Sequence, residues 1–190
     1  MLRYKLLISI FCLAFIAGIP APAWGFDSLV VGLDEAAVIV NPEDQTDVRI
    51  LLKFDPLTEL DSNDVIMSAK LRSTVNVVNA PGRSILLHVD PLCTNWNANT
   101  VGWSSPWTNA GGDIEDNLSV MGRITKADSQ NVQIDITRII KRIAAGSIDD
   151  YGIMLRQIGA TKREFAVRNS SQPGGGHPLV ELVIYYLTRE

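Results

Sequence analysis

Along most of this 190-residue chain, hydrophobic and polar residues alternate with the two-residue period of a half-buried β-strand. Residues 132–136 show the pattern clearly, because Val132, Ile134 and Ile136 alternate with polar residues. Turn residues separate the other predicted strands, which are 29–33, 36–40, 48–55, 65–78, 84–90, 120–124, 151–158, 164–167 and 179–187. Many short strands at close spacing predict an all-β sandwich, not a fold of alternating strands and helices.

The hydrophobic period changes once, directly after residue 136. Apolar residues then fall on one side of a helix and basic residues on the other, Ile139, Ile140, Ile143 and Ala144 against Arg138, Lys141 and Arg142. Asp135 or Thr137 can cap the first turn, and Gly146 stands where a left-handed residue ends a helix. The pattern predicts one short helix over residues 138–145.

The first 25 residues have the pattern of an export signal. Arg3 and Lys5 precede an apolar stretch at 6–19, and a Pro-broken run of small residues follows at 20–25. A membrane anchor is the alternative, but the apolar stretch is too short to span a bilayer comfortably. We therefore expect a cleaved signal peptide (1–25) and a secreted (extracellular or periplasmic) domain over 26–190, with no membrane span after cleavage. Two cleavage patterns fit, so the mature chain starts at Trp24 or at Phe26.

The composition of the exported part limits its partners. Removing Arg3 and Lys5 from the 17 basic residues leaves 15 against 21 acidic residues, a net charge of about −6. This charge argues against a nucleic-acid partner. Cys93 is the one cysteine outside the signal peptide, so no internal disulfide can form, and we expect it to be buried as a small hydrophobic residue.

Residues that could carry out catalysis or bind a metal are few. His88 and His177 lie in or beside predicted strands, and no nucleophile, base and orienting residue occur together, so we expect no enzyme; a small polysaccharide-acting enzyme stays a minor alternative. Asp113, Glu115 and Asp116 supply oxygen ligands suited to a structural calcium ion. The alternative, which we favour, is that they are turn residues bonded to their own backbone, and we expect no other cofactor.

Aromatic and basic residues offer the best candidates for ligand binding. Trp96, Trp103 and Trp107 occur in a segment rich in Asn, Ser and Thr, a composition that suits sugar stacking and hydrogen bonding. We expect Trp96 and Trp103 to be mostly buried and Trp107, which follows Pro106, to be exposed for ligand contact. Three arginines that could bind the carboxylates of an acidic polymer follow in the sequence: Arg156, Arg163 and Arg168. The alternative, which we favour, is that the basic residues from 138 to 168 form a solvated helix face and charged hairpins.

The order of several short motifs resembles the DNRLRE-type domain, whose family includes a group of carbohydrate-binding modules. The motifs are LLKFD (51–55), VIMSAKLR (65–72), HVDPLCTNWNANTVGWSSP (88–106), IDITRII (134–140), YGIMLR (151–156), FAVRNSS (165–171) and HPLVELVIYY (177–186). The resemblance implies a jelly-roll-like β-sandwich that is secreted or displayed at the cell surface and is not catalytic.

Two functions follow as expectations. The first is a secreted, non-catalytic carbohydrate-binding module that holds a polysaccharide, acidic or neutral, through Trp107 and the arginines. The second is a structural or adhesive cell-surface module with a protein partner and no sugar site. An exposed face that carries Trp107 and the arginines together favours the first, and a flat apolar face favours the second.

Overall fold

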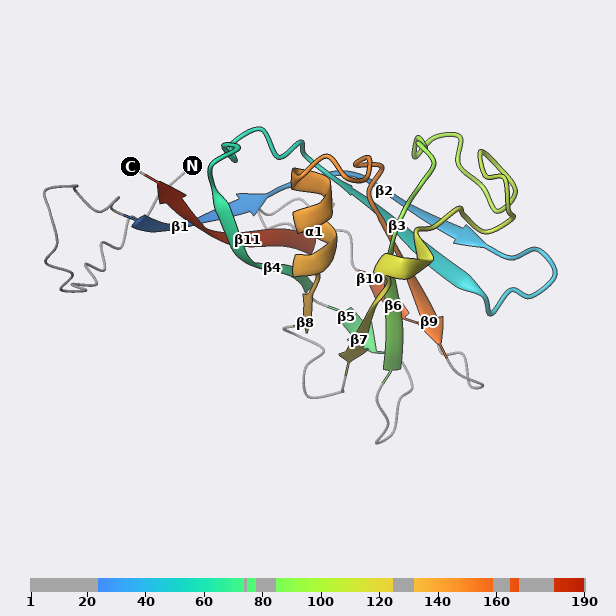
Figure 1. Cartoon of the computed structure of the whole chain (residues 1–190). Coiled ribbons are helices and arrows are strands. Elements are labelled where there is room, and N and C mark those ends of the chain that lie inside the picture. Colours follow the sequence, from blue (N-terminus) through green and yellow to red (C-terminus); the bar gives the residue numbers. More distant parts are fainter. Residues whose placement is uncertain are drawn as a thin grey trace, which may run out of the picture.

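The structure is a computed structural model that describes residues 24–73, 75–77, 85–124, 132–158, 165–167 and 180–189. Its elements in chain order are β1 (Trp24–Val31), β2 (Leu33–Val40), β3 (Val48–Phe54), β4 (Val65–Ser73), β5 (Val75–Val77), β6 (Ile85–Pro91), the short 3-10 helix η1 (Asp116–Leu118), β7 (Val120–Ile124), β8 (Val132–Asp135), α1 (Thr137–Ala144), β9 (Ile153–Ile158), β10 (Phe165–Val167) and β11 (Val180–Arg189) (Figure 1). The predicted signal peptide lies outside the described residues except for Trp24 and Gly25, which begin β1.

The strands form two antiparallel sheets, with the orders β1-β11-β4-β8 and β2-β3-β9-β6-β7, and a separate pair of β5 with β10. With β2 set aside, the eight other strands of the two sheets follow the order of a jelly roll, first-eighth-third-sixth in one sheet and second-seventh-fourth-fifth in the other. The prediction of an all-β, jelly-roll-like sandwich is confirmed. At the open end of the first sheet, Trp24 pairs with Arg189, so the two ends of the described chain are neighbours.

Alternate residues of both sheets fill the core between them. In β6, for example, Ile85, Leu87 and Val89 are buried in this main core, as the period-2 pattern predicts. The helix α1 adds Ile139 and Ile140 to the same core and contacts β4.

The predicted helix is confirmed, and so is Gly146 as the residue that follows its end, but the predicted cap by Asp135 or Thr137 is wrong, because the N-cap is Ile136, whose side chain makes no cap hydrogen bond. The helix starts at Thr137, one residue earlier than expected, and the Asp135 carboxylate accepts a hydrogen bond from the Thr137 backbone N–H at 2.9 Å. Hydrogen bonds from the Thr137 hydroxyl and backbone N–H lower the pKa of Asp135, although partial burial opposes the shift. Gly146 has a φ of 62°, the left-handed conformation that ends a helix. No helix among the described residues is long and apolar enough to cross a membrane.

A second, smaller core lies on the outer face of the five-stranded sheet, which points away from the other sheet. Its strand residues are Ile39, Leu51 and Met154, and the long connection from β6 to β7 packs on them with Leu92, Trp96 and Trp107. In Figure 1 this connection, coloured yellow-green, folds above β2 and β3. We call residues 93–119 the covering loop. The buried strand residues of this cluster come from β2, β3 and β9, and none comes from β6 or β7.

Candidate functional site

The strand register brings three basic side chains together beside the covering loop. His88 of β6 pairs with Arg156 of β9, and Arg156 pairs with Arg49 of β3. All three occupy outward positions, because their chain neighbours Val89, Leu155 and Ile50 belong to the main core. Neighbouring strands lie about 4.8 Å apart. His88, Arg156 and Arg49, which we call the basic row, therefore cross three strands side by side.

A buried carboxylate anchors the middle of the basic row. Asp90 is 0% exposed, and its Oδ2 accepts a hydrogen bond from Arg156 Nε at 2.5 Å. Its Oδ1 accepts the hydroxyl of Ser119 and lies 3.8 Å from His88 Nδ1. A fully buried carboxylate is tolerated only with such partners. The Arg156 side chain is 32% exposed, so the guanidinium is fixed on one side by Asp90 while part of it faces solvent.

Ser119, His88 and Asp90 are the residue types of a hydrolytic triad, but their contacts differ from one. The Ser119 hydroxyl donates to Asp90, whereas a nucleophilic serine must donate to the histidine. His88 Nδ1 lies 3.3 Å from Arg156 Nη2, so the imidazole and the guanidinium are side by side against Asp90. These contacts orient Arg156 and do not activate a nucleophile.

Arg49 ties the basic row to the covering loop. Its Nη1 donates to the backbone oxygen of Gly111 at 2.6 Å, and its Nη2 lies 3.5 Å from Asp47. The guanidinium carbon lies 4.5 Å from the centre of the Trp103 ring, in cation–π geometry. Trp103 was expected to be mostly buried but is only half-buried. Because it stacks on Arg49, its indole is the aromatic group beside the basic row.

The other two tryptophans of the covering loop are structural. Trp96 is buried as predicted, and its Nε1 donates to the backbone oxygen of Tyr151 at 2.8 Å. The prediction that Trp107 is exposed is wrong, because it is 7% exposed and its Nε1 donates to the backbone oxygen of Gly102 at 2.8 Å. The physical reason is the apolar outer face of β3 and β9, on which the loop buries its large rings. Trp107 therefore has no open ring face for a sugar.

The three predicted arginines have different outcomes. Arg156 is partly exposed in the basic row, whereas Arg163 and Arg168 lie outside the described residues. Sequence reasoning missed Asp90, Ser119 and Arg49. The signal that could have found Asp90 is its spacing of two from His88, which places both on the same face of one strand.

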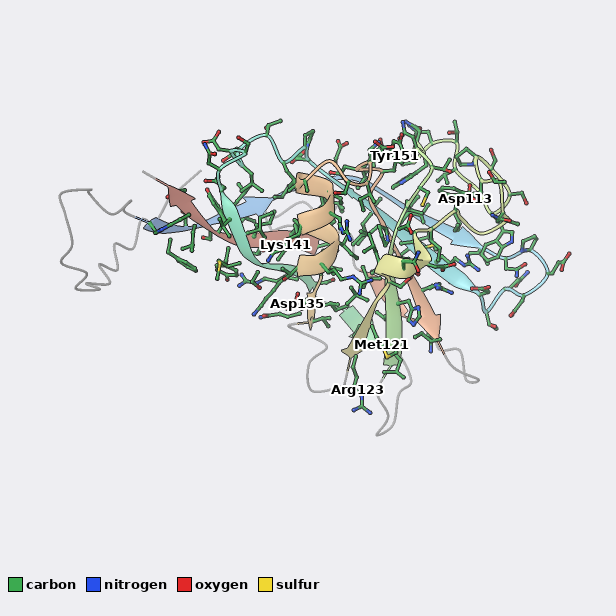
Figure 2. All side chains as sticks on the ribbon, in the orientation of Figure 1. Asp113, Met121, Arg123, Asp135, Lys141 and Tyr151 are labelled. Atoms are coloured by element: carbon green, nitrogen blue, oxygen red, sulfur yellow. The ribbon has the colours of Figure 1, made fainter. Side chains whose placement is uncertain are left out.

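Asp113 stabilises the covering loop and does not gather the other predicted metal ligands around it. Its carboxylate accepts hydrogen bonds from the backbone N–H groups of Thr108 and Asn109 and from the side chains of Thr94 and Asn109. Burial alone would raise its pKa, but these hydrogen bonds outweigh that effect and lower the pKa to about 2. No group of three or more His, Cys, Asp or Glu side chains that could hold a metal ion occurs in the described part of the chain, and the calcium site at Asp113, Glu115 and Asp116 stays a prediction. Figure 2 shows Asp113 in the loop, apart from Met121 and Arg123 on β7.

Cys93 was expected to be buried but is exposed, beside a small pocket of about 190 Å³. The pocket is lined by Leu92, Cys93, Glu115, Ile148, Asp149 and Tyr151. Partial desolvation of the thiol and the nearby carboxylates, Glu115 first, raise the pKa of Cys93. A protonated thiol is a poor nucleophile and a poor metal ligand.

No protein-family model matches the chain, and no curated protein matches it. The resemblance to the DNRLRE-type domain therefore stays a prediction.

Proposed function

We propose that the protein is a secreted, non-catalytic module that binds an acidic polysaccharide along the basic row. The observation that carries the proposal is the alignment of His88, Arg156 and Arg49 on one outward sheet face of an acidic chain. Guanidinium groups bind carboxylates through charge-assisted hydrogen bonds that are stronger than neutral ones. Asp90 holds Arg156 in place before a ligand arrives, which reduces the entropy lost on binding.

The position of the row suits a polymer better than a small molecule. His88, Arg156 and Arg49 lie on neighbouring strands across an outward sheet face, so a linear chain laid across the strands meets them in succession. The half-buried Trp103 ring stands beside Arg49 and supplies an apolar edge against a sugar ring. The aromatic contact that we propose is therefore Trp103 and not Trp107.

Affinity-gel electrophoresis tests the proposal. Polygalacturonate and alginate should retard the protein, a neutral cellulose derivative should retard it less, and added salt should weaken the retardation. Arg156→Gln should weaken binding about 10-fold or more, the usual effect of losing a hydrogen bond to a charged group. The matched control is Arg142→Gln, which removes the same charge from the exposed side of α1 and should change nothing.

Two further measurements make the result decisive. Arg156→Lys keeps the charge but loses the planar fork, so it should bind more weakly than the parent if the contact is bidentate. The melting temperature of each variant shows whether it folds. The proposal fails if no acidic polymer retards the parent protein, or if Arg142→Gln loses as much affinity as Arg156→Gln.

A structural or adhesive module with a protein partner is the second candidate. The observation that favours it is the set of exposed apolar side chains on β1 and β4, which are Trp24, Phe26, Val30, Val65 and Met67. Large exposed apolar side chains gathered on one sheet are typical of protein interfaces. Under this alternative, Phe26→Ser should abolish partner binding, and all polysaccharides should leave the protein unretarded.

A further inference from the structure

The edge strand β1 has an open side. Among the described strands it pairs with β11 alone and stands at the end of the order β1-β11-β4-β8. Its eight residues pair with β11 in an unbroken register without a bulge. The backbone N–H and C=O groups on the free side of such a strand are a template for another strand.

β1 has only one of the features that protect edge strands, the inward-pointing Asp27, whose carboxylate accepts the backbone N–H of Ser28 at 2.8 Å. It contains no Lys, Arg or Pro, and its one charged residue is Asp27. The other edges are protected or short, since β2 has a register shift between Leu33 and Glu35, β7 has five residues and β8 has four. The apolar side chains Trp24, Phe26 and Val30 are 46%, 44% and 47% exposed, which is high for residues of their size.

We propose that β1 pairs antiparallel with β1 of a second copy of the chain, about a two-fold axis at Ser28. In this register, Phe26 lies opposite Val30 of the second copy, twice by symmetry, and Asp27 lies opposite Leu29. An aromatic residue opposite a β-branched one is a favourable cross-strand pair. An axis at Asp27 would instead set two carboxylates against each other, and an axis at Leu29 would set Phe26 opposite Gly32.

The size of the contact sets its strength. Eight residues of strand span about 26 Å, and a sheet edge is about 10 Å across, which gives a few hundred Å² per partner. Stable complexes bury about 800 Å² per partner. The dimer is therefore weak and forms at micromolar to millimolar concentrations. The two-fold axis uses the free edge of both copies, so the assembly closes as one eight-stranded sheet and does not grow into a fibre.

Sedimentation velocity over micromolar to millimolar concentrations tests the pairing, with reductant present so that the exposed Cys93 forms no disulfide between copies. The mean mass should rise from monomer toward dimer. Ser28→Lys and Ser28→Glu each place like charges opposite each other at the axis, and each should weaken the dimer at least about fivefold. An equal mixture of the two variants should associate better than either alone.

The matched control is Ala36→Lys, which adds the same charge at an exposed position of the other edge strand β2 and should leave the dimer unchanged. Circular dichroism of each variant confirms that it folds. A parent protein that stays monomeric throughout the concentration range would overturn the proposal. So would a dimer that tolerates Ser28→Lys, or a mixture no better associated than the separate variants. Polysaccharide binding at the basic row does not depend on any of these outcomes.

Discussion

Removing Arg156 should destabilise the protein more than neutralising Asp90, although the two side chains form one ion pair. The difference follows from burial, because Asp90 is 0% exposed while Arg156 is 32% exposed. In Arg156→Ala the buried carboxylate keeps the Ser119 hydroxyl as a partner but loses its cation. In Asp90→Asn the guanidinium that remains can be hydrated, because part of it already faces solvent.

The expected magnitudes differ clearly. Removing one partner of an ion pair so that the other stays buried and charged costs about 3–5 kcal/mol in free energy of unfolding, which is the expectation for Arg156→Ala. Losing a hydrogen bond whose remaining partner reaches water costs about 1–2 kcal/mol, which is the expectation for Asp90→Asn. Adding Asp90→Asn to Arg156→Ala removes the stranded charge. The double variant should therefore be more stable than Arg156→Ala alone.

Urea unfolding followed by tryptophan fluorescence measures these differences, since Trp96 and Trp107 are buried. The slope of the free energy of unfolding against urea concentration should be the same for the parent, the two single variants and the double variant. A constant slope means that the variants differ in stability and not in the compactness of the unfolded state. A double variant that is as unstable as the sum of the single variants would refute the reasoning. An Asp90→Asn variant less stable than Arg156→Ala would refute it as well.

Two further predictions concern the covering loop and the connection between α1 and β9. The folded pKa of Asp113, about 2, lies below its unfolded value of about 3.9, so its contribution to stability is present above about pH 4 and is lost as the pH falls through 2. By urea unfolding, Asp113→Ala should cost about 1 kcal/mol at pH 7, a figure reduced for solvent screening, and clearly less at pH 2. Gly152 has a φ of 88°, and a Cβ there would lie 2.3 Å from the backbone oxygen of Leu52. At Gly122 a Cβ would instead lie 2.6 Å from the side chain of Ile134, which can move. Gly152→Ala should therefore lower the melting temperature more than Gly122→Ala.

The strand pattern predicted the sandwich because each sheet buries one face and exposes another, as in β6 and β8. It predicted the helix to within one residue at its start, and it predicted the end of the helix from Gly146, which acts through local backbone geometry. These features depend on near neighbours in the sequence.

The burial of Trp107 depends on where a long loop lies on a sheet, and loop composition does not contain that information. A signal was present elsewhere, in the continuous apolar runs Ile50-Leu51-Leu52 and Ile153-Met154-Leu155. Such runs indicate strands buried on both faces. They predict that something covers β3 and β9, and the tryptophan-rich loop was the available cover. The ion pair of Asp90 with Arg156 was harder to predict, because pairing of β6 with β9 is not readable from either strand alone.

The pairing of Trp24 with Arg189 determines how the fold responds to mechanical force. The hydrogen bonds between antiparallel strands run perpendicular to the strands. Tension that pulls Trp24 away from Arg189 acts along these bonds and breaks them one pair at a time, starting at that end. It does not load all of the bonds at once, as a force along the strands would. We therefore expect the sandwich to extend at low force when pulled through its two ends and to resist more strongly when pulled along the length of a single strand.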